Sequence, residues 1–457
     1  MSDLAAAEAL IEAGDIAGAR AIGEQLLDEG VAGVHNLLGY LAHHEGRLIE
    51  AQLQFELACS LAPEDVDARD NLAAVRAELG ALYGAAPAAA AAPAAPQADF
   101  SGSFDDLRRG VYGPGLSATL LGRYMAAPLG PGLEQRLLEL PGATTSDERR
   151  FLCRFAACFW DGQGDVFENG PMFGGTTRAL ALGMLGSANR SPDARLQTFD
   201  WFYYGSDTDA SGVSFDAMIR QRLISSGQKR EMEESRSFKA VFDTLHSGHD
   251  YSPLVNSHVA YLPGAPGDVA KTGEPTFSLP EGRRYSLVFI DGCKSWYGTR
   301  FTFEQLAPYI EPGSHLIFQD YGWYTCFWLP SFINALGEHF RLVAHVDDTY
   351  AFELLAPLDA DDVRARFPEH PKDFGIDAFD DLFMRALIDA GERSDVHAMV
   401  ALTIQHAGAM AYLGMKAEAK QYISGMLTRP EFFPFRRRMI ERALVAPTYS
   451  PEGAITL

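Results

Sequence analysis

The sequence has few cysteines, no long apolar run and fewer basic than acidic residues. Its five cysteines are scattered, with no C-x-x-C pair and no zinc-ligand spacing, which favours free thiols in a reducing, cytoplasmic setting. No stretch approaches the roughly 20 apolar residues that span a bilayer, and the first residues carry no basic region typical of a secretory signal. The net charge of −23 disfavours nucleic acid and anionic membrane surfaces as partners, because both would repel the chain.

The sequence also lacks the two common phosphate-binding glycine motifs, G-x-G-x-x-G and G-K-[ST]. In their place, a short apolar run stops at Glu168, a glycine-dense turn follows, and residues 176–185 have the pattern of a helix. The spacing is Glu168-x-Gly170-x-x-x-Gly174-Gly175, in which glycines allow close backbone approach and the helix start offers free N–H groups. A carboxylate before the glycines suits a cationic or hydroxyl-rich ligand better than a pyrophosphate. The alternative is an ordinary turn between a strand and a helix of an α/β core.

Composition divides the chain into four segments. Residues 1–84 hold two helix pairs with a period of about 32–34 residues and Gly at the inter-helix turns, and they resemble tetratricopeptide repeats. Such repeats bind peptides, so we expect a protein partner there, with a dimerisation or docking arm as the alternative. Residues 85–97 are nearly all Ala and Pro and predict a linker. An α/β domain is expected over residues 98–356 and a helical region over residues 357–457.

The middle of the chain alternates apolar strand patterns with helical patterns, which predicts a mostly parallel sheet with right-handed crossovers. Four of the expected strands end at an acidic residue: Glu168, Asp200, Asp291 and Asp320. Because parallel strands present their carboxyl ends at one edge of the sheet, the four carboxylates should gather where such sheets bind ligands. A ligand with hydroxyls and a positive centre, or a metal ion, would offset the repulsion among them. The strands are expected at residues 166–168, 196–199, 258–262, 285–290, 315–319, 340–346 and 349–355.

These motifs, taken in order, resemble a known family. The Glu-x-Gly-x-x-x-Gly-Gly turn, Asp200 at a strand end, residues 289–292 (Phe-Ile-Asp-Gly) and residues 312–321 (Pro-Gly to Gln-Asp-Tyr) are similar to those of class I S-adenosylmethionine-dependent methyltransferases. The sequence looks most like the macrocin O-methyltransferase branch, whose members methylate sugar hydroxyls, over residues 145–355. The resemblance implies a Rossmann-like methyltransferase sheet, S-adenosylmethionine as the cofactor, and a hydroxylated small molecule or glycan as the acceptor.

The resemblance also implies roles for individual residues. Glu168 and the first glycines of the turn would shape the pocket beside the methionine and sulfonium of the cofactor. Asp200 would hold the ribose diol, and residues 264–268 would border the adenine. The residues expected to contact the cofactor are Glu168, Gly170, Gly174, Gly175, Asp200 and Asp291.

The sequence departs from this branch at the place where a metal and a base are expected. The branch commonly carries Asp-Gly-Asp-His after the fourth strand and paired acids after the fifth, which bind Mg²⁺ and supply a base. This sequence has Asp291-Gly292-Cys293-Lys294 and Gln319-Asp320 there. The resemblance leaves Asp291 and Asp320 as catalytic carboxylates and as Mg²⁺ ligands, with Gln319 as a further oxygen donor. Lys294 is the third catalytic candidate: its ammonium could replace the metal, act as the base if burial lowered its pKa, or form a salt bridge to Asp291.

Two further functions stay open. One is a non-catalytic repeat scaffold with a degenerate methyltransferase domain, because part of the acid and histidine motif is missing. The other is an oxygenase like cephalosporin hydroxylases, which usually needs two His and one carboxylate on iron. His345-x-Asp347 is a close pair of that form, and we interpret it as accidental. Four aromatic residues are candidates for the wall of an acceptor-sugar site, with core packing as the alternative: Tyr321, Trp323, Tyr324 and Trp328.

Overall fold

The computed structural model describes residues 3–13, 15–26, 32–44, 65–83, 118–140, 143–204, 215–220, 222–266, 277–292, 295–393 and 395–429, with isolated positions between 51 and 62 and between 432 and 442. Among these residues, no helix combines the length and the apolar character needed to cross a membrane. The contacts divide the chain into two compact units, Met1–Ala94 and Ala95–Leu457. The expected linker at 85–97 and the catalytic candidate Lys294 lie outside the described residues, so both stay predictions.

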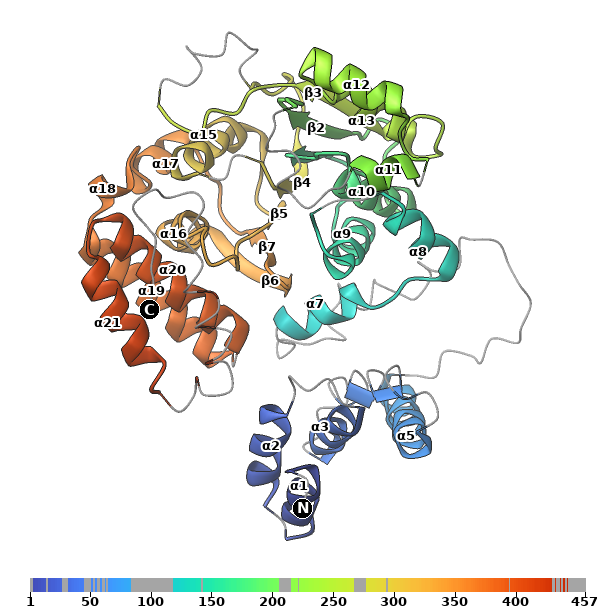
Figure 1. Ribbon diagram of the computed structural model, residues 1–457, viewed down its shortest axis with the longest axis vertical. Coiled ribbons are helices and arrows are strands. Elements are labelled where there is room, and N and C mark those ends of the chain that lie inside the picture. The colour runs from blue at the N-terminus through green and yellow to red at the C-terminus, as the bar shows by residue number, and fades with distance from the viewer. Residues whose placement is uncertain are drawn as a thin grey trace. The chain divides into compact units, whose positions relative to one another are not determined.

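The N-terminal unit is helical in its described part. It contains α1 (Asp3–Glu12), α2 (Ile16–Gln25), α3 (Ala32–His44) and α5 (Val66–Tyr83) (Figure 1). The small side chains of Ala7 and Ala19 are fully buried among leucines of α3, so these helices pack closely. The helices expected here are present over these spans, and their assignment as tetratricopeptide repeats stays a prediction.

The second unit is built around a seven-stranded mixed sheet (Figure 1). Its strand order is β3-β2-β1-β4-β5-β7-β6, in which β1 to β5 pair in parallel and β7 is antiparallel to both of its neighbours. The α/β sheet expected from the alternating patterns is confirmed. The strands are β1 (Asp165–Asn169), β2 (Leu196–Asp200), β3 (Val255–Val259), β4 (Tyr285–Ile290), β5 (His315–Phe318), β6 (Phe340–Val346) and β7 (Thr349–Leu354).

One face of the sheet is covered by helices that flank β1 in the sequence. They are α7 (Ala118–Ala126), α8 (Pro131–Leu138), α9 (Ser146–Cys158) and α10 (Gly175–Gly186). Phe151 and Phe155 of α9 are fully buried and belong to one apolar cluster with Phe289 of β4. A capping box starts α9, because Thr145 and Glu148 each accept a hydrogen bond from the backbone N–H of the other. The box holds the buried Glu148 side chain at the start of the helix.

The opposite face is covered by α15 (Trp296–Leu306), α16 (Trp328–Ala335) and the C-terminal helices. Phe318 of β5 lies in one apolar cluster with Phe379 and Leu402 from beyond residue 357. The C-terminal helices therefore share the core of the sheet and belong to the same compact unit. They are α17 (Ala360–Arg366), α18 (Pro371–Phe374), α19 (Ile376–Glu392), α20 (Val396–Tyr412) and α21 (Lys416–Met426).

In the described part of the segment between β2 and β3, the chain makes an excursion that contains three α-helices. They are α11 (Phe215–Arg220), α12 (Ser226–Ser235) and α13 (Lys239–His246). The strand expected at 258–262 instead ends at Val259, so its predicted bounds are wrong. Val259 pairs with Asp200, the last residue of β2, and the apolar residues that follow Val259 extend past the edge of the sheet. Apolar character alone does not reveal where the hydrogen-bonding partner strand ends.

Candidate functional site

The strand order reverses between β1 and β4. From β1 the sheet continues through β2 and β3 toward one edge, and from β4 it continues through β5 toward the other. Open α/β sheets bind ligands outside the carboxyl ends of the strands at such a switch point. Asn169 at the end of β1 pairs with Ile290 at the end of β4. The turns that begin at Gly170 and Asp291 therefore leave the sheet side by side.

These two turns are packed backbone to backbone. Gly170 has a φ of +75°, and a Cβ there would lie only 2.5 Å from the backbone N of Gly292, so only glycine fits. The side-chain oxygen of Asn169 accepts hydrogen bonds from the N–H groups of Asp291 (2.8 Å) and Gly292 (3.0 Å). Asn169 is thus a structural centre of the site that the sequence-based candidates omit. A polar residue that ends an apolar strand is the signal that could have identified it.

Glu168 is fully buried beneath the start of α10. Its two oxygens accept hydrogen bonds from the hydroxyls of Thr176 (2.7 Å) and Thr177 (2.6 Å) in the first turn of that helix. Burial raises the pKa of Glu168 to about 7, because the hydroxyls offset only part of the desolvation of a carboxylate. Glu168 therefore anchors the glycine turn to β1 and holds a proton in a fraction of molecules at neutral pH.

The side chain of Asp200, the last residue of β2, stabilises the loop that follows this strand. Its carboxylate accepts a hydrogen bond from the backbone N–H of Phe202 (2.6 Å), a residue with a φ of +52°. Burial raises the pKa of Asp200 to about 6, and the N–H groups of Phe202 and Met172 oppose that effect. The charge of Asp291 raises the pKa of both Asp200 and Glu168, so these three carboxylates lie within electrostatic reach of one another.

The loops at the carboxyl edge contain backbone strain. Four of them, after β1, β2, β5 and β6, each hold a non-glycine residue in the left-handed conformation, which costs about 1–2 kcal/mol. Such residues cluster at functional sites, where the surrounding structure holds them in place. The strain supports a binding or catalytic role for this edge. The residues are Met172 (φ 51°), Phe202 (φ 52°), Asp320 (φ 64°) and Asp347 (φ 47°).

Asp320 lies in the turn after β5, one strand further along the edge than Asp291. The neighbouring Gln319 is buried, and its amide N donates to Glu148 (2.8 Å) while its oxygen accepts from Thr349 (2.6 Å). Among the described residues, no group of three or more His, Cys, Asp or Glu side chains is placed to hold a metal ion. A Mg²⁺ site made by Asp291, Asp320 and water molecules has only two carboxylates, so it stays a prediction.

The remaining glycines of the turn are covered by protein. Gly174 has a φ of +87°, and a Cβ there would overlap the ring of His246 from α13. The Nε2 of His246 lies 3.2 Å from the carbonyl oxygen of Phe173, and burial lowers the pKa of His246 to about 4, so the ring is neutral at pH 7. At Gly175 a Cβ would lie 3.1 Å from the guanidinium carbon of Arg149. These glycines thus allow α13 and α9 to pack against the turn.

The aromatic residues after β5 do not form the expected acceptor wall. Tyr321, Tyr324 and Trp328 are buried and pack in apolar clusters with residues of the C-terminal helices. Trp323 is half buried, with the Arg442 guanidinium over its ring. The core-packing alternative therefore applies to these residues, because the C-terminal helices cover them.

A different aromatic group lies at the candidate site, after β2 and β3. Trp201 stacks on Tyr203 with ring centroids 4.4 Å apart, and Tyr261 meets Trp201 edge-on at 4.9 Å. Tyr203 is 40% exposed, so this group presents an aromatic surface beside Asp200. The sequence-based candidates omit these residues, and the helical excursion separates Tyr261 from the other two in the sequence.

His345 and Asp347 do not converge on one ligand. The Nε2 of His345 lies 2.8 Å from both the hydroxyl of Thr119 and a carboxylate oxygen of Asp395. Asp347 instead accepts a hydrogen bond from the hydroxyl of Thr145 (2.9 Å). The described contacts therefore give no support to an iron site at this pair.

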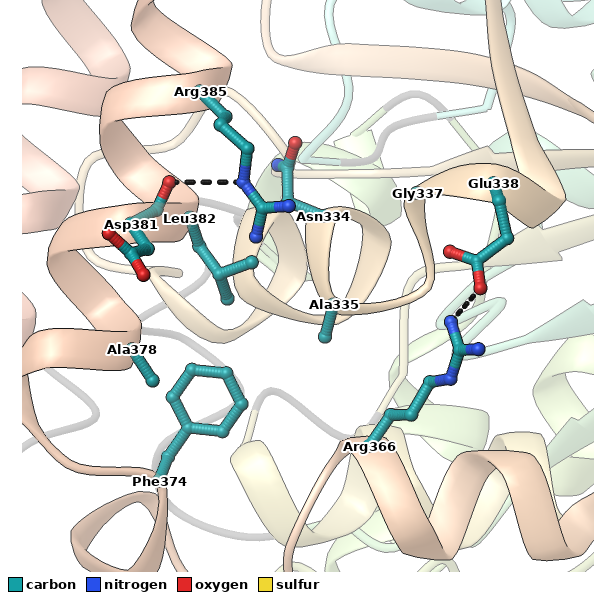
Figure 2. Close-up of a pocket in the computed structure, with 10 residues that line it drawn as sticks. All are labelled: Asn334, Ala335, Gly337, Glu338, Arg366, Phe374, Ala378, Asp381, Leu382 and Arg385. Atoms are coloured by element: carbon teal, nitrogen blue, oxygen red, sulfur yellow. Dashed lines mark hydrogen bonds and ion pairs between the residues drawn. The ribbon is translucent and has the colours of Figure 1, made fainter.

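A cavity of about 580 Å³ lies away from these residues. Figure 2 shows the Glu338–Arg366 ion pair on one side of it and Arg385 with its hydrogen bond to Asp381 on the other. Glu338 precedes β6, and the register places the start of β6 at the amino end of β5, the edge opposite the switch point. The cavity contains none of the sequence-predicted site residues. It is lined by Asn334, Ala335, Gly337, Glu338, Arg366, Phe374, Ala378, Asp381, Leu382 and Arg385.

No family model matches the sequence, and no curated protein matches it. Solved structures match at low similarity. The O-methyltransferase NovP is 14% identical, with 45% of this chain and 77% of that chain covered at a TM-score of 0.28. CalS11, described as a TDP-rhamnose 3'-O-methyltransferase of calicheamicin biosynthesis, is 15% identical, with 45% and 76% covered at 0.28. Cofactor-bound Rv0187 from MTB is 16% identical, with 50% and 88% covered at 0.28. Likeness at this level carries no argument about the activity of this chain.

Proposed function

We propose that the unit Ala95–Leu457 binds S-adenosylmethionine at the carboxyl ends of β1, β2 and β4 and methylates a hydroxyl of a sugar or glycan. The observation that supports this most is the meeting of Glu168, Asp200 and Asp291 around two closely packed turns at the switch point. Carboxylates held together repel one another unless a ligand offsets their charge. S-adenosylmethionine offers a ribose diol and a sulfonium that carries a transferable methyl group.

The described residues fit this cofactor. Asp200 can accept hydrogen bonds from two adjacent hydroxyls, and its pKa of about 6 leaves it mostly ionised at pH 7. The amide Nδ2 of Asn169 is a buried donor for which the described residues supply no acceptor, and it suits a carboxylate or hydroxyl of the ligand. The charges of Glu168 and Asp291 complement a positive sulfonium.

We further propose that the cofactor and the acceptor bind at different places along this edge. Asp200 follows β2 and Asp320 follows β5, with β1 and β4 between them. We assign the cofactor to the β1–β2 side and the acceptor to the β4–β5 side, with Asp320 as general base. As the acceptor oxygen bonds to the methyl carbon, the carbon–sulfur electron pair leaves with sulfur and the hydroxyl proton passes to the Asp320 carboxylate. The remaining contribution of the protein is to hold the oxygen in line with the methyl group.

Transfer of label from methyl-labelled S-adenosylmethionine to a panel of free and nucleotide-linked sugars tests this proposal. Asp320→Asn should lower turnover on the order of 100-fold, because it removes the proton acceptor. Asp347→Asn is the matched control, since Asp347 is also a left-handed acidic residue but is bound to Thr145. A wild-type chain that binds the cofactor yet labels no hydroxyl would favour the scaffold alternative.

A further inference from the structure

The turn that carries Asp320 has an unusual backbone. Asp320 is left-handed (φ 64°), the N–H of Trp323 donates to the Asp320 carbonyl (3.0 Å), and the N–H of Gly322 donates to the carbonyl of Asp348 (3.1 Å). A non-glycine residue keeps this conformation only where its surroundings hold it. The carbonyl of Trp323 accepts a hydrogen bond from the backbone N–H of Cys326 (3.0 Å), and the carbonyls of Tyr321 and Gly322 need donors from elsewhere in the fold.

Those donors come from the C-terminal segment. Gln405 of α20 is fully buried, and its side-chain amide donates to the carbonyls of Tyr321 (2.7 Å) and Trp323 (2.8 Å). Arg442 donates to the carbonyl between them, that of Gly322 (3.3 Å). Three successive carbonyls of the turn therefore accept hydrogen bonds from residues that lie more than 80 positions further along the chain.

Packing reinforces these hydrogen bonds. The Arg442 guanidinium lies over the rings of Trp323 and Tyr324, 5.8 Å from each centroid, and forms an ion pair with Asp348 (3.6 Å). Tyr324 belongs to an apolar cluster with Ile404, next to Gln405 in α20. Burying an amide is costly unless it forms hydrogen bonds, and both hydrogen bonds that the buried Gln405 Nε2 donates go to this turn, whereas the described residues supply no donor to its Oε1.

We propose that Gln405, together with Arg442, is a positioning residue of the reaction, and that α20 thereby forms part of the acceptor side of the site. The inference rests on the proposed function, because it assumes that Asp320 acts on the acceptor. The two side chains fix the backbone of the turn so that the Asp320 carboxylate stays at the edge of the sheet. They are far along the edge from Asp200, so they should affect turnover without affecting cofactor binding.

Gln405→Leu tests this, because it keeps the size of the side chain and removes both donors. His406→Gln is the matched control: His406 is the next residue of α20, it is also buried, and its side chain bonds to Asp380 (2.6 Å) instead of the turn. Three quantities are measured in the full chain: kcat, the Kd of S-adenosylmethionine, and hydrogen exchange of the amides at 320–324.

For Gln405→Leu we expect kcat to fall on the order of 10- to 100-fold, exchange at 320–324 to accelerate, and the cofactor Kd to stay unchanged. His406→Gln should leave all three as in the wild type. Unchanged exchange in Gln405→Leu, or an equal loss of kcat in His406→Gln, would overturn the inference. If Gln405→Leu does not fold, Arg442→Met, which removes the donor to Gly322, must show the same accelerated exchange or the inference fails.

The two proposals fail separately. If the wild type transfers no methyl group, the proposed function falls, and the exchange measurement still decides whether Gln405 holds the turn. If the wild type is active and Gln405→Leu is equally active, the positioning role falls and the proposed function stands.

Discussion

Gly170→Ala should destabilise the sheet unit more than Gly248→Ala, although both glycines have a φ of +75°. Alanine in the left-handed conformation costs about 1–2 kcal/mol at either position. At Gly248 the added methyl group would meet no atom within 4 Å, whereas at Gly170 it would lie 2.5 Å from N and 2.7 Å from Cα of Gly292. Both are backbone atoms that cannot rotate away, so overpacking should add about 1–3 kcal/mol.

Tryptophan fluorescence during urea unfolding measures this difference in the right unit, because all five tryptophans lie within residues 95–457. We expect the free energy of unfolding to fall by about 1–2 kcal/mol for Gly248→Ala and by about 2–5 kcal/mol for Gly170→Ala. Cofactor affinity should weaken in Gly170→Ala alone, since the overlap displaces the turn that carries Asp291. Equal losses of stability in the two variants would refute the close approach of the turns after β1 and β4.

Three further predictions concern the same edge. Burial raises the pKa of Glu168 to about 7, so the native state keeps a proton that the unfolded state releases near pH 4.5. As the pH rises from 4.5 to 8, Glu168 should therefore lower the free energy of unfolding of the wild type by about 3 kcal/mol, and Glu168→Gln should lack this decrease. Urea unfolding at pH 5 and 8 checks this, and parallel pH profiles of the two proteins would contradict it. Gly174→Ala should destabilise by a few kcal/mol, and His246→Ala in the same chain should restore part of the loss, as a double-mutant cycle would show; additive losses would contradict the overlap. Because the proposed mechanism uses the Asp320 carboxylate itself as the base, turnover should persist in excess EDTA; a loss that Mg²⁺ reverses would show a metal site at Asp291 and Asp320.

Much of the sheet could be predicted because strand patterns are local. Val166 and Phe167 stand before a glycine turn, and the apolar run 285–290 matches β4 at both ends. The acidic residues at strand ends identified the edge, because parallel strands share one carboxyl edge whatever their order. This reasoning needs only the direction of each strand and no knowledge of its neighbours.

The parts that failed depend on partners distant in the sequence. Periodicity places Tyr321 and Trp328 on apolar faces but does not reveal that the C-terminal helices cover them. The sequence around Gln405 reads as an ordinary helix, and only the fold shows that its amide reaches the turn after β5. Gly174 was interpreted as room for a ligand, whereas the structure fills the adjacent space with His246.

Calorimetric titration of the chain with S-adenosylmethionine tests the central claim most directly. The wild type should bind one molecule with a Kd in the micromolar range, about −8 kcal/mol. Asp200→Asn keeps an oxygen acceptor for the N–H of Phe202 but loses the charge and one acceptor for the ribose diol, so it should bind at least about tenfold more weakly with an unchanged unfolding midpoint. Absence of binding by the folded wild type at millimolar cofactor would contradict the account.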